Sequence, residues 1–567
     1  MQEEIKRFLF IDLLGVIAGA IGGFGAILFR EMIKINQILF FSIILPHITF
    51  MVNNVNIGLI LLPAIGGLIV GPIVYKYAPE AKGHGVPEVM EAVRLYQGRI
   101  RKRVAIVKIV VSSVTIGSGG SAGREGPIAQ IGSAFGALLG DILDIDVKER
   151  RLIVVSGLAA GIAGTFNAPL GGAIFGLEVM FGGLSLTNAI AVILASVIGA
   201  AIVEMVYGPY PAFFAPEELT FTNPIELVFY CILGIIFGFI AVLWVKLFYA
   251  FENFYERLPI NSLRVALGGL FTGIIGFAYY SYGIFGVGYE GINLVLSGKI
   301  SLPLLLTLGI LKMLATANTI GSGGSGGVFA PSLFIGAMFG GALGLLFHTI
   351  APTIVLHPFT YSLAGMAALF AATAHVPLCM IVMIPEMSND YSLLLPMMLV
   401  SSTSYIISKL ILGDANIYTL KLMRKGVRLL IPEDMSAFEI LKVEEFMTKD
   451  AITVSPETSL IEVYNLIKKT NHDSFPVLEK GKLVGIITSD DIMREPIHML
   501  PKRKVKDAMS KSYIYVYSDD SIKKAIEILY SKGIGKLLVV SRKDSRKLEG
   551  VLTKTDIIKA YIYITSL

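Results

Sequence analysis

A long run of uncharged residues limits what this chain can fold into. From Met313 to Pro385, 73 consecutive residues include no Asp, Glu, Lys or Arg, and this length exceeds two membrane spans of about 20 residues each. Leu152 to Leu177 is a second such run. With 54% hydrophobic and 16% charged residues among 567, the chain has too little polar surface to cover a soluble globule. The sequence therefore predicts a multi-pass integral membrane protein embedded in a lipid bilayer.

Charges and cysteines exclude several other classes of protein. The apolar run near the N-terminus follows acidic residues and has no small-residue cleavage site, which predicts a retained membrane helix rather than a signal peptide. Cys231 and Cys379 lie in apolar segments and are too few for a disulfide framework. The basic clusters 99–103, 148–151 and 502–506 adjoin apolar segments or link domains. They indicate cytoplasmic-side positive charge, and no nucleic-acid partner is expected.

The composition changes between Lys421 and Pro432, where mixed charge replaces lipid-compatible sequence. We therefore expect an all-α polytopic membrane domain over residues 1–430 and a soluble α/β domain over residues 431–567. Many apolar segments of the first domain are interrupted by glycine, and several are too short to span a bilayer. Such segments predict broken or re-entrant helices that line a path enclosed by protein.

The membrane domain contains an internal duplication. The block GSGGSAGREGP at Gly117–Pro127 recurs as GSGGSGGVFAP at Gly321–Pro331, an offset of 204. A second block, Gly157–Leu170, recurs at Gly365–Leu378 with an offset of 208, and the match extends to Glu178 and Glu386. One block alone would be explained by close helix packing, but two in the same order indicate a duplicated unit. We expect the two copies to have inverted topology, which brings equivalent helix N-termini to one site.

The soluble domain also contains a repeat. The segment that begins at Val443 recurs from Val505, an offset of 62, and each copy runs into GIITSDDI or GVLTKTDI. Each copy alternates an amphipathic helix with β-branched runs and ends in a Thr-x-x-Asp turn. We expect two β-α-β-β-α units over residues 443–496 and 505–561.

The repeated glycine-serine blocks have the chemistry of an anion site. An anion inside a membrane must have its lost hydration replaced without a charge that holds it too tightly. Helix N-termini do this, because their unpaired N–H groups and positive dipole end face the ion. Both blocks lead into apolar helices at Pro127 and Pro331, where proline suits the first turn. The duplicated block therefore predicts an anion site.

Three ordered motifs carry a family resemblance. Gly83–Glu88 (GHGVPE), Gly123–Pro127 (GREGP) and Gly326–Pro331 (GGVFAP) resemble the signature segments of the CLC chloride channel and exchanger family. The similarity covers residues 1–430, and a pair of CBS domains is a common C-terminal companion in that family. The resemblance implies transport of chloride or a similar small anion, and a homodimer with one pore in each subunit. It implies no required cofactor, no catalytic residues and no metal site.

The same resemblance assigns roles to single residues. Glu125 is similar to the external gating glutamate, which occupies an anion site when ionised and vacates it when protonated. Its alternative role is a salt bridge with Arg124. Tyr418 matches the central tyrosine, whose hydroxyl donates to the anion; alone, it would be an ordinary interfacial tyrosine. The backbone N–H groups implied as donors are those of Val328 and Phe329 at the central site, and of Arg124, Glu125 and Gly126 at the outer site.

Two positions depart from the family pattern. His84 stands where the family usually has a serine that donates to the central anion. An imidazole can also donate, and the alternative is a neutral histidine turned away from the pore. Val179 stands where proton-coupled exchangers carry an internal glutamate, with Glu178 beside it. Because valine cannot relay a proton, we expect channel-like or uncoupled conduction, with chloride/proton antiport as the alternative.

The soluble repeat resembles a tandem of CBS domains. The matching positions are Thr488, Asp491, Thr553 and Asp556, and the resemblance implies an adenine nucleotide (ATP, ADP or AMP) held by the Thr hydroxyls and Asp carboxylates. The alternative is that each Asp only caps a helix and the tandem is a dimerisation scaffold. A nucleotide sensor belongs in the cytoplasm, so we expect a plasma-membrane protein with cytoplasmic CBS domains.

An enzyme is the rival hypothesis. Residues 323–326 fit the GxSG pattern of intramembrane serine proteases, with Ser325 as nucleophile and His348 or His375 as base. However, Ser325 lies inside the duplicated block, where packing and anion contact explain it without catalysis. Ser325→Ala should leave a transporter active and inactivate a protease.

Overall fold

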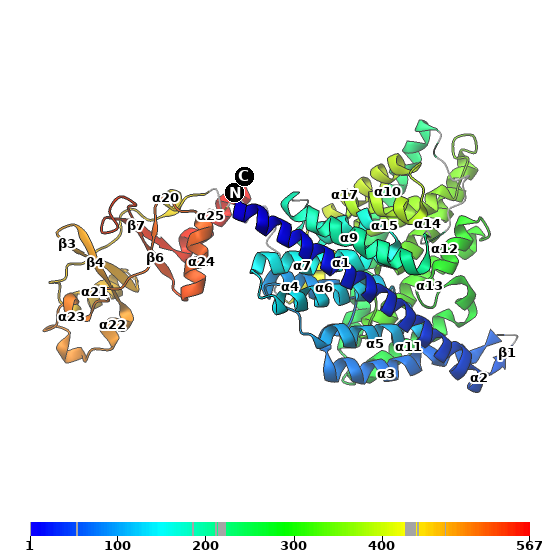
Figure 1. Ribbon diagram of the computed structural model, residues 1–567, viewed down its shortest axis with the longest axis horizontal. Coiled ribbons are helices and arrows are strands. Elements are labelled where there is room, and N and C mark those ends of the chain that lie inside the picture. Colours follow the sequence, from blue (N-terminus) through cyan, green and yellow to red (C-terminus); the bar gives the residue numbers. More distant parts are fainter. Residues whose placement is uncertain are drawn as a thin grey trace. The chain divides into compact units, whose positions relative to one another are not determined.

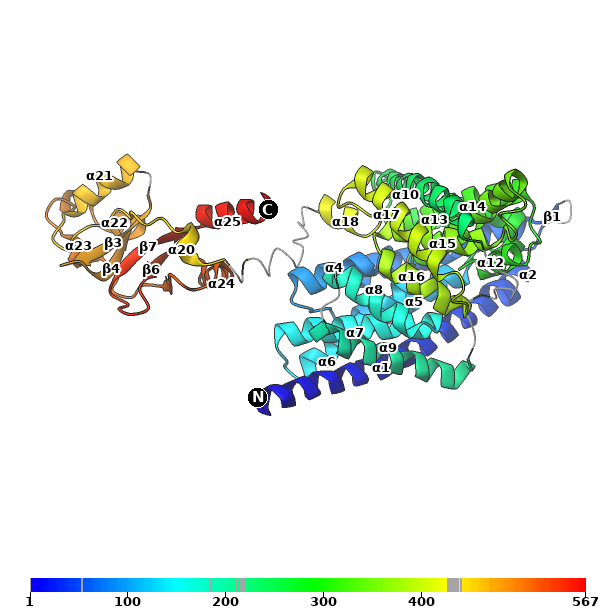
Figure 2. The same cartoon turned by 90° about the horizontal axis from the view of Figure 1, so that it is seen from above.

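The computed structural model describes residues 2–52, 55–183, 186–209, 213, 221, 223–425, 438, 441–470 and 472–566. The chain forms two compact units, Met1–Leu429 and Leu430–Leu567 (Figures 1 and 2). The predicted boundary between residues 430 and 431 lies outside the described residues. The predicted fold class is confirmed, because the first unit is helical and the second mixes helices with small sheets.

The first unit consists almost entirely of helices. Among the described residues, eight helical segments are long and apolar enough to cross a membrane, and three apolar helices are shorter. The short ones, α8, α15 and α16, correspond to the broken helices expected from the sequence. The bounds are α1 Gln2–Gln37, α2 Leu45–His47, α3 Leu61–Tyr77, α4 Val86–Leu95, α5 Arg103–Gly117, α6 Glu125–Ile142, α7 Val147–Phe166, α8 Pro169–Phe181, α9 Leu186–Tyr207, α10 Leu227–Glu256, α11 Leu263–Gly276, α12 Tyr289–Leu296, α13 Leu302–Gly321, α14 Phe329–Ile350, α15 Thr360–Ala374, α16 Pro377–Ser388, α17 Leu394–Leu412 and α18 Thr419–Arg424, with a short hairpin of β1 Met51–Val52 and β2 Val55–Asn56.

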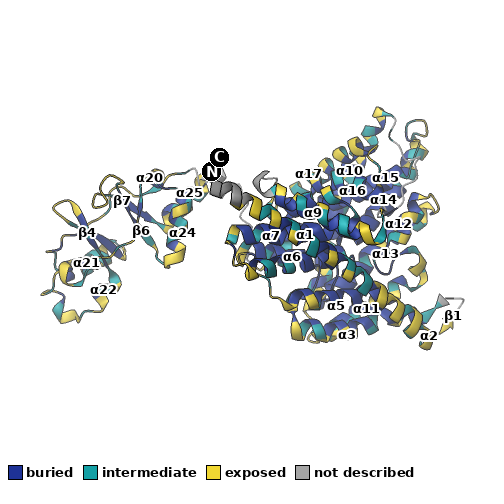
Figure 3. Ribbon diagram, in the orientation of Figure 1, coloured by how far each residue is buried: buried dark blue, intermediate teal, exposed yellow. Residues whose placement is uncertain are grey.

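Burial separates the inner helices from the outer ones. The described residues of α7 and α15 are almost all buried, whereas α1, α10 and α17 alternate buried and exposed faces (Figure 3). The exposed faces carry large apolar side chains such as Leu28, Phe239 and Leu410. Extensive apolar exposure of this kind is unfavourable in water and suits a lipid environment.

The duplication is visible in the helix packing. Helix α6 packs along α7, and α14 packs along α15. A side chain at Gly132 of α6 would overlap the carbonyl oxygen of Gly157 on α7, and one at Gly336 of α14 would overlap that of Gly365 on α15. Both pairs of helices therefore approach through glycines at equivalent repeat positions, which is how small residues allow close packing in membranes.

The second unit contains two similar halves. In the first half, β3 pairs antiparallel with β4, and Val454 bridges in parallel to Val477. In the second half, β6 pairs in parallel with β5 and antiparallel with β7. Each half has its own apolar core between its helices and its sheet. The bounds are α20 Val443–Phe446, α21 Leu460–Thr470, β3 Ser474–Glu479, β4 Lys482–Thr488, α22 Ser489–Met493, α23 Val505–Ala508, β5 Tyr515–Tyr517, α24 Ile522–Lys532, β6 Lys536–Val540, β7 Leu548–Thr553 and α25 Lys554–Ser566.

Candidate anion site

The three sequence motifs meet in the middle of the membrane unit. Gly123 and Gly327 donate to each other's carbonyl oxygens, with N···O distances of 2.7 and 2.6 Å. Gly83 donates to the carbonyl of Gly324 at 3.0 Å and accepts from the amide of Gly326 at 3.2 Å. Segments more than 200 residues apart are thus joined by backbone hydrogen bonds, as in a small sheet.

Close backbone contact explains why glycine is needed at this junction. A side chain at Gly126, in the first turn of α6, would overlap the carbonyl oxygen of His84. Any larger residue would push the segment that carries His84 away from the start of α6. The glycine therefore keeps two of the motifs in register.

Glu125 lies where two helix N-termini converge. It is the first residue of α6, it is only 2% exposed, and its Oε2 accepts from the backbone N–H of Ala330 in the first turn of α14 at 3.4 Å. Val328 and Phe329, the predicted donors, immediately precede Ala330 and are also buried. A carboxylate thus occupies a position at which two positive helix ends favour an anion.

Arg124 has contacts separate from this carboxylate. Its Nη2 donates to the carbonyl of Thr165 at 3.1 Å, and its guanidinium carbon lies 5.4 Å from the centre of the Tyr289 ring. These contacts point the guanidinium toward α7 and α12.

His84 and Tyr418 face each other across the junction. Their ring centroids are 5.7 Å apart, and the His84 ring also lies 5.6 Å from that of Phe248. His84 is 2% exposed, and neither ring nitrogen has a hydrogen-bond partner in the described part of the chain. Tyr418 stands at the start of α18 and contacts the rings of Phe175 and Phe370. His84 and Tyr418 therefore bring polar groups into an aromatic setting next to the helix N-termini.

Helix α8 places Val179 and Glu178 in different surroundings. Val179 is buried in the apolar core one turn beyond Phe175, whose ring contacts that of Tyr418. The Glu178 carboxylate accepts from the backbone N–H groups of Leu378 and Cys379 at 3.1 and 2.8 Å. It therefore lies at the N-terminus of α16, as the rotation of about 100° between consecutive helical residues allows.

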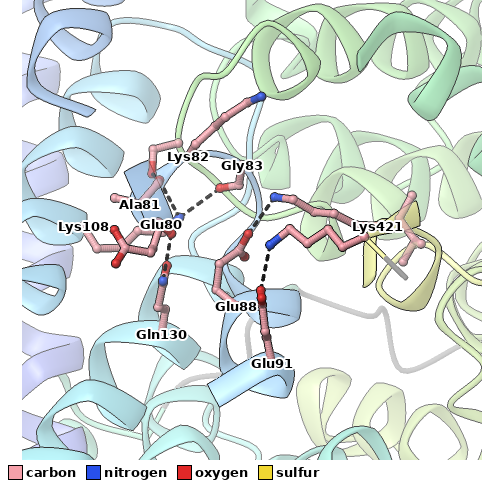
Figure 4. Close-up of polar contacts among 12 residues, drawn as sticks. Glu80, Ala81, Lys82, Gly83, Glu88, Glu91, Lys108, Gln130 and Lys421 are labelled. Carbon is pink, nitrogen blue, oxygen red and sulfur yellow. Dashed lines mark hydrogen bonds and ion pairs between the residues drawn. The ribbon is translucent and has the colours of Figure 1, made fainter. Parts of the chain in front are cut away.

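Two buried lysines were missed in the sequence. The Nζ of Lys108 donates to the carbonyls of Ala81 and Gly83 at 3.0 and 2.9 Å (Figure 4). The Nζ of Lys312 donates to three carbonyls in the segment 283–286 at 2.8–3.1 Å. Both residues are fully buried, and they are 204 positions apart, the same offset as the duplicated block. This shared offset was the available signal.

Ion pairs join α18 and the residue that follows it to α4, the helix that begins two residues after His84. Lys421 pairs with Glu88 at 2.6 Å (Figure 4). Lys425 pairs with Glu91 at 2.7 Å. These four residues line a cavity of about 990 Å³, which we call the Lys421 cavity. Helices α4 and α18 lie at the end of the membrane unit remote from α2 and β1 (Figure 2). The lining thus brings acidic and basic side chains of α4 and of the α18 segment together in one cavity.

In the second unit, the predicted nucleotide residues pair with each other. The hydroxyl of Thr488 donates to the Asp491 carboxylate at 2.7 Å, and that of Thr553 donates to Asp556 at 2.7 Å. Each Asp also accepts from the backbone N–H of its Thr, so both motifs cap the helix that follows. Asp556 additionally pairs with Lys559 at 3.0 Å.

The residues of the rival protease hypothesis are engaged elsewhere. Ser325 Oγ donates to the carbonyl of Ala81 at 2.7 Å and lies 2.8 Å from Ser112 Oγ. His348 contacts the carbonyl of Val355, and His375 contacts the hydroxyl of Ser408. In the described part of the chain, these hydrogen bonds do not connect Ser325 with either histidine.

Comparison with protein families now identifies the chain. The model of the voltage-gated chloride channel family matches residues 66–409, which is more than half of the chain. The chain belongs to the CLC family. The CBS domain model matches residues 443–498 and 505–563, so the predicted CBS pair is confirmed. The protein is thus a multi-span membrane protein of a family that transports anions.

Curated relatives and solved structures agree with this assignment. A "putative chloride channel protein ClcB-like" of Ralstonia nicotianae is 34% identical over 61% of this chain and 81% of the relative. An "H(+)/Cl(-) exchange transporter ClcA" of Vibrio parahaemolyticus is 33% identical over 62% of this chain and 76% of the relative. A slow cyanobacterial Cl⁻/H⁺ antiporter aligns with a TM-score of 0.64 and 25% identity over 74% of this chain and 97% of the solved one. A eukaryotic CLC transporter has the same fold, with a TM-score of 0.63 and 19% identity over 98% of both chains.

Proposed function

We propose that the protein conducts chloride or a similar small anion passively through a pore gated by Glu125. The observation that carries this proposal is the Glu125 carboxylate at the N-termini of α6 and α14, where its Oε2 accepts from Ala330. An ionised carboxylate there competes with the transported anion for the same N–H groups and dipoles. Protonation removes the competing charge and opens the path.

Other groups of the same junction would bind the anion after it passes Glu125. The backbone N–H groups of Val328 and Phe329, the Tyr418 hydroxyl and one N–H of the His84 imidazole are the donors we assign to the central site. Neutral donors replace hydration without trapping the ion.

The outer site has its own donors. On the outer side of the pore, the backbone N–H groups of Arg124, Glu125 and Gly126 replace the hydration of the anion.

Passive conduction is supported by Val179. Coupled exchange needs a titratable relay on the inner side, and valine has no proton to transfer. Its neighbour Glu178 binds the backbone of α16 and is therefore already engaged. The test is reconstitution in liposomes, with chloride efflux and proton movement recorded together. Chloride efflux without proton uptake supports passive conduction.

Chloride/proton exchange is the second candidate. The relative from Vibrio parahaemolyticus is named an H(+)/Cl(-) exchange transporter, and the cyanobacterial structure is described as an antiporter. If this chain is also an exchanger, the same liposomes will drive protons uphill in a chloride gradient. Proton pumping at a fixed ratio to chloride would favour exchange over passive conduction.

We also propose the assembly and orientation of the protein. It forms a homodimer in the plasma membrane with one pore per subunit, and its CBS pair faces the cytoplasm. There the pair binds an adenine nucleotide through Thr488, Asp491, Thr553 and Asp556. Cross-linking in native membranes tests the dimer, and protease access to the CBS pair in right-side-out and inverted vesicles tests the orientation.

A further inference from the structure

A second cavity has Arg124, the neighbour of Glu125 in the chain, in its wall. It has a volume of about 670 Å³, and its walls include Arg30, Lys34, Arg124 and Tyr289. We call it the Arg124 cavity. Arg124 directly precedes Glu125 in the chain, so the wall of this cavity adjoins the segment that carries the gate. None of the donors assigned to the pore above belongs to α1, yet α1 contributes much of this wall.

The cavity carries more positive than negative charge. Arg30 and Lys34 are four residues apart on α1, so they lie on one face of the helix. Both line the cavity together with Arg124. A fourth cation lies behind the wall, because Lys312 Nζ donates to the carbonyls of Gly283 and Gly286, two glycines that line the cavity. The acidic lining residues are Glu31 and Glu290.

Neighbouring contacts hold part of this charge in place. The Tyr207 hydroxyl donates to Glu31 at 2.6 Å, and the Arg30 guanidinium carbon lies 4.0 Å from the centre of the Tyr207 ring. The quadrupole of an aromatic ring attracts a cation over its face, which favours this position of the guanidinium. Tyr207 therefore fixes Arg30 and Glu31 side by side at the cavity wall, while Lys34 is exposed.

We propose that the Arg124 cavity is an outer capture site for small inorganic anions, and that Arg30 and Lys34 are its recognition residues. The inference rests on the proposed function, because the captured anion is the one that Glu125 admits. Clustered positive charge in a concave wall raises the local anion concentration and the rate of association. The site attracts a hydrated anion by charge, whereas the neutral donors beyond Glu125 replace the hydration shell.

Transport in vesicles of defined orientation tests the proposal. The variant is Arg30→Gln with Lys34→Gln, and the measurement is the initial rate of chloride uptake against external chloride at low ionic strength. In right-side-out vesicles, the half-saturating chloride concentration should rise about threefold to tenfold, because two unit charges near the ion are removed. In inverted vesicles it should not change. In right-side-out vesicles, the difference in half-saturating chloride concentration between variant and wild type should shrink at high ionic strength, where the Debye length falls to about 3 Å.

Matched variants exclude a general effect of charge or folding. Lys299→Gln removes an exposed lysine outside the cavity lining and should leave both orientations unchanged. Lys34→Arg keeps the charge and should transport like the wild type. If the double variant does not fold, Lys34→Gln alone should raise the half-saturating concentration about twofold to threefold. The proposal would be overturned if the double variant has the wild-type half-saturating chloride concentration in right-side-out vesicles. An equal rise of this concentration in both orientations would also overturn it.

Bromide binding separates failure of this inference from failure of the proposed function. Crystals of the wild type soaked in bromide should show anomalous density in the Arg124 cavity, and crystals of the double variant should not. If wild-type vesicles carry no anion at all, the proposed function fails, and the bromide signal still decides whether the cavity binds anions. An empty cavity in the wild type would refute the capture site.

Discussion

Glu178 and Glu386 each cap the helix that carries the other. Glu178 of α8 accepts from the amides of Leu378 and Cys379 in the first turn of α16. Glu386 of α16 accepts from the amides of Leu170 and Gly171 in the first turn of α8, at 3.0 and 2.6 Å. The two acids are equivalent in the duplication, so the repeat produces a reciprocal pair of charged caps that fixes α8 against α16.

Removing either cap should destabilise the membrane unit. Glu386→Gln keeps the shape of the side chain but loses the charge that binds two amides, so we expect a loss of about 1–3 kcal/mol in the free energy of unfolding. The double variant with Glu178→Gln should lose less than the sum, because both caps hold the same pair of helices. Unfolding in mixed micelles measures these values. If the loss in the double variant equals the sum of the two single losses, the two caps stabilise the helices independently, which would contradict this prediction.

Glu125→Gln should make anion flux largely independent of external pH. The amide keeps the shape of the carboxylate but does not titrate, so no negative charge competes for the N-termini of α6 and α14. Flux in liposomes across a series of external pH values is the measurement. Glu290→Gln, which removes an acid of the Arg124 cavity wall, is the control and should keep the pH dependence of the wild type. A pH profile unchanged in Glu125→Gln would contradict the gating role.

The convergence of the two glycine-serine blocks could be foreseen from the duplication, but their precise contacts and the place of the Gly83–Glu88 motif beside them could not. Two glycine-serine blocks at one offset indicate equivalent helix starts, and the structure joins them through Gly123 and Gly327. The partner of Glu178 could not be predicted in this way. Helical rotation shows that Glu178 and Val179 face different directions, but only the tertiary fold shows which helix stands opposite.

The buried lysines illustrate a different limit of sequence reasoning. A single lysine in an apolar helix usually extends its amine to the membrane surface. Lys108 and Lys312 instead turn inward and bind backbone carbonyls, because the segments 81–83 and 283–286 turn carbonyl oxygens toward the two amines. Those acceptors lie in a short 3-10 turn and in loops, and the paths of these segments depend on contacts distant in sequence.

Lys312→Met should disturb the Arg124 cavity. The ammonium group binds the carbonyls of Gly283, Ile284 and Gly286, and a methionine fills similar space without donating. Buried carbonyls that lose their donor cost about 1–3 kcal/mol each, so we expect a clear loss of thermal stability in detergent. Lys299→Met, at an exposed lysine, should have little effect. Equal melting temperatures for the two variants would contradict the structural role of Lys312.

Asp491→Ala and Asp556→Ala should each weaken adenine-nucleotide binding by about tenfold or more, because a hydrogen bond to a charged group contributes about 1.5–3 kcal/mol. Calorimetry on the full chain in micelles with ATP, ADP and AMP is the measurement. Asp490→Ala changes the exposed neighbour of Asp491 and should bind like the wild type. Since each Asp also caps a helix, thermal unfolding without nucleotide separates loss of the cap from loss of the ligand. Absence of binding by the wild type would refute the sensor.

Proton coupling depends on position 179, which is a valine in this chain. The family resemblance implies that proton-coupled exchangers carry an acid at this position, which would pass protons toward the gate. Here the side chain is apolar and packed among the buried residues of α8 and its neighbours, while Glu178 is bound to the backbone of α16. Neither residue provides a free titratable group on the path to Glu125.

We therefore expect the reversal potential in a planar bilayer to follow the chloride gradient alone and to ignore an imposed pH gradient. Val179→Glu is the attempt to install coupling, and Val179→Gln is its control, because glutamine has the same size but no titratable proton. Proton uptake driven by chloride in Val179→Glu, but not in Val179→Gln, would show that a missing relay is what keeps the wild type uncoupled. Uphill proton pumping by the wild type would instead require another titratable group, and His84, buried beside Tyr418 with both ring nitrogens unpartnered among the described residues, would be the first to replace.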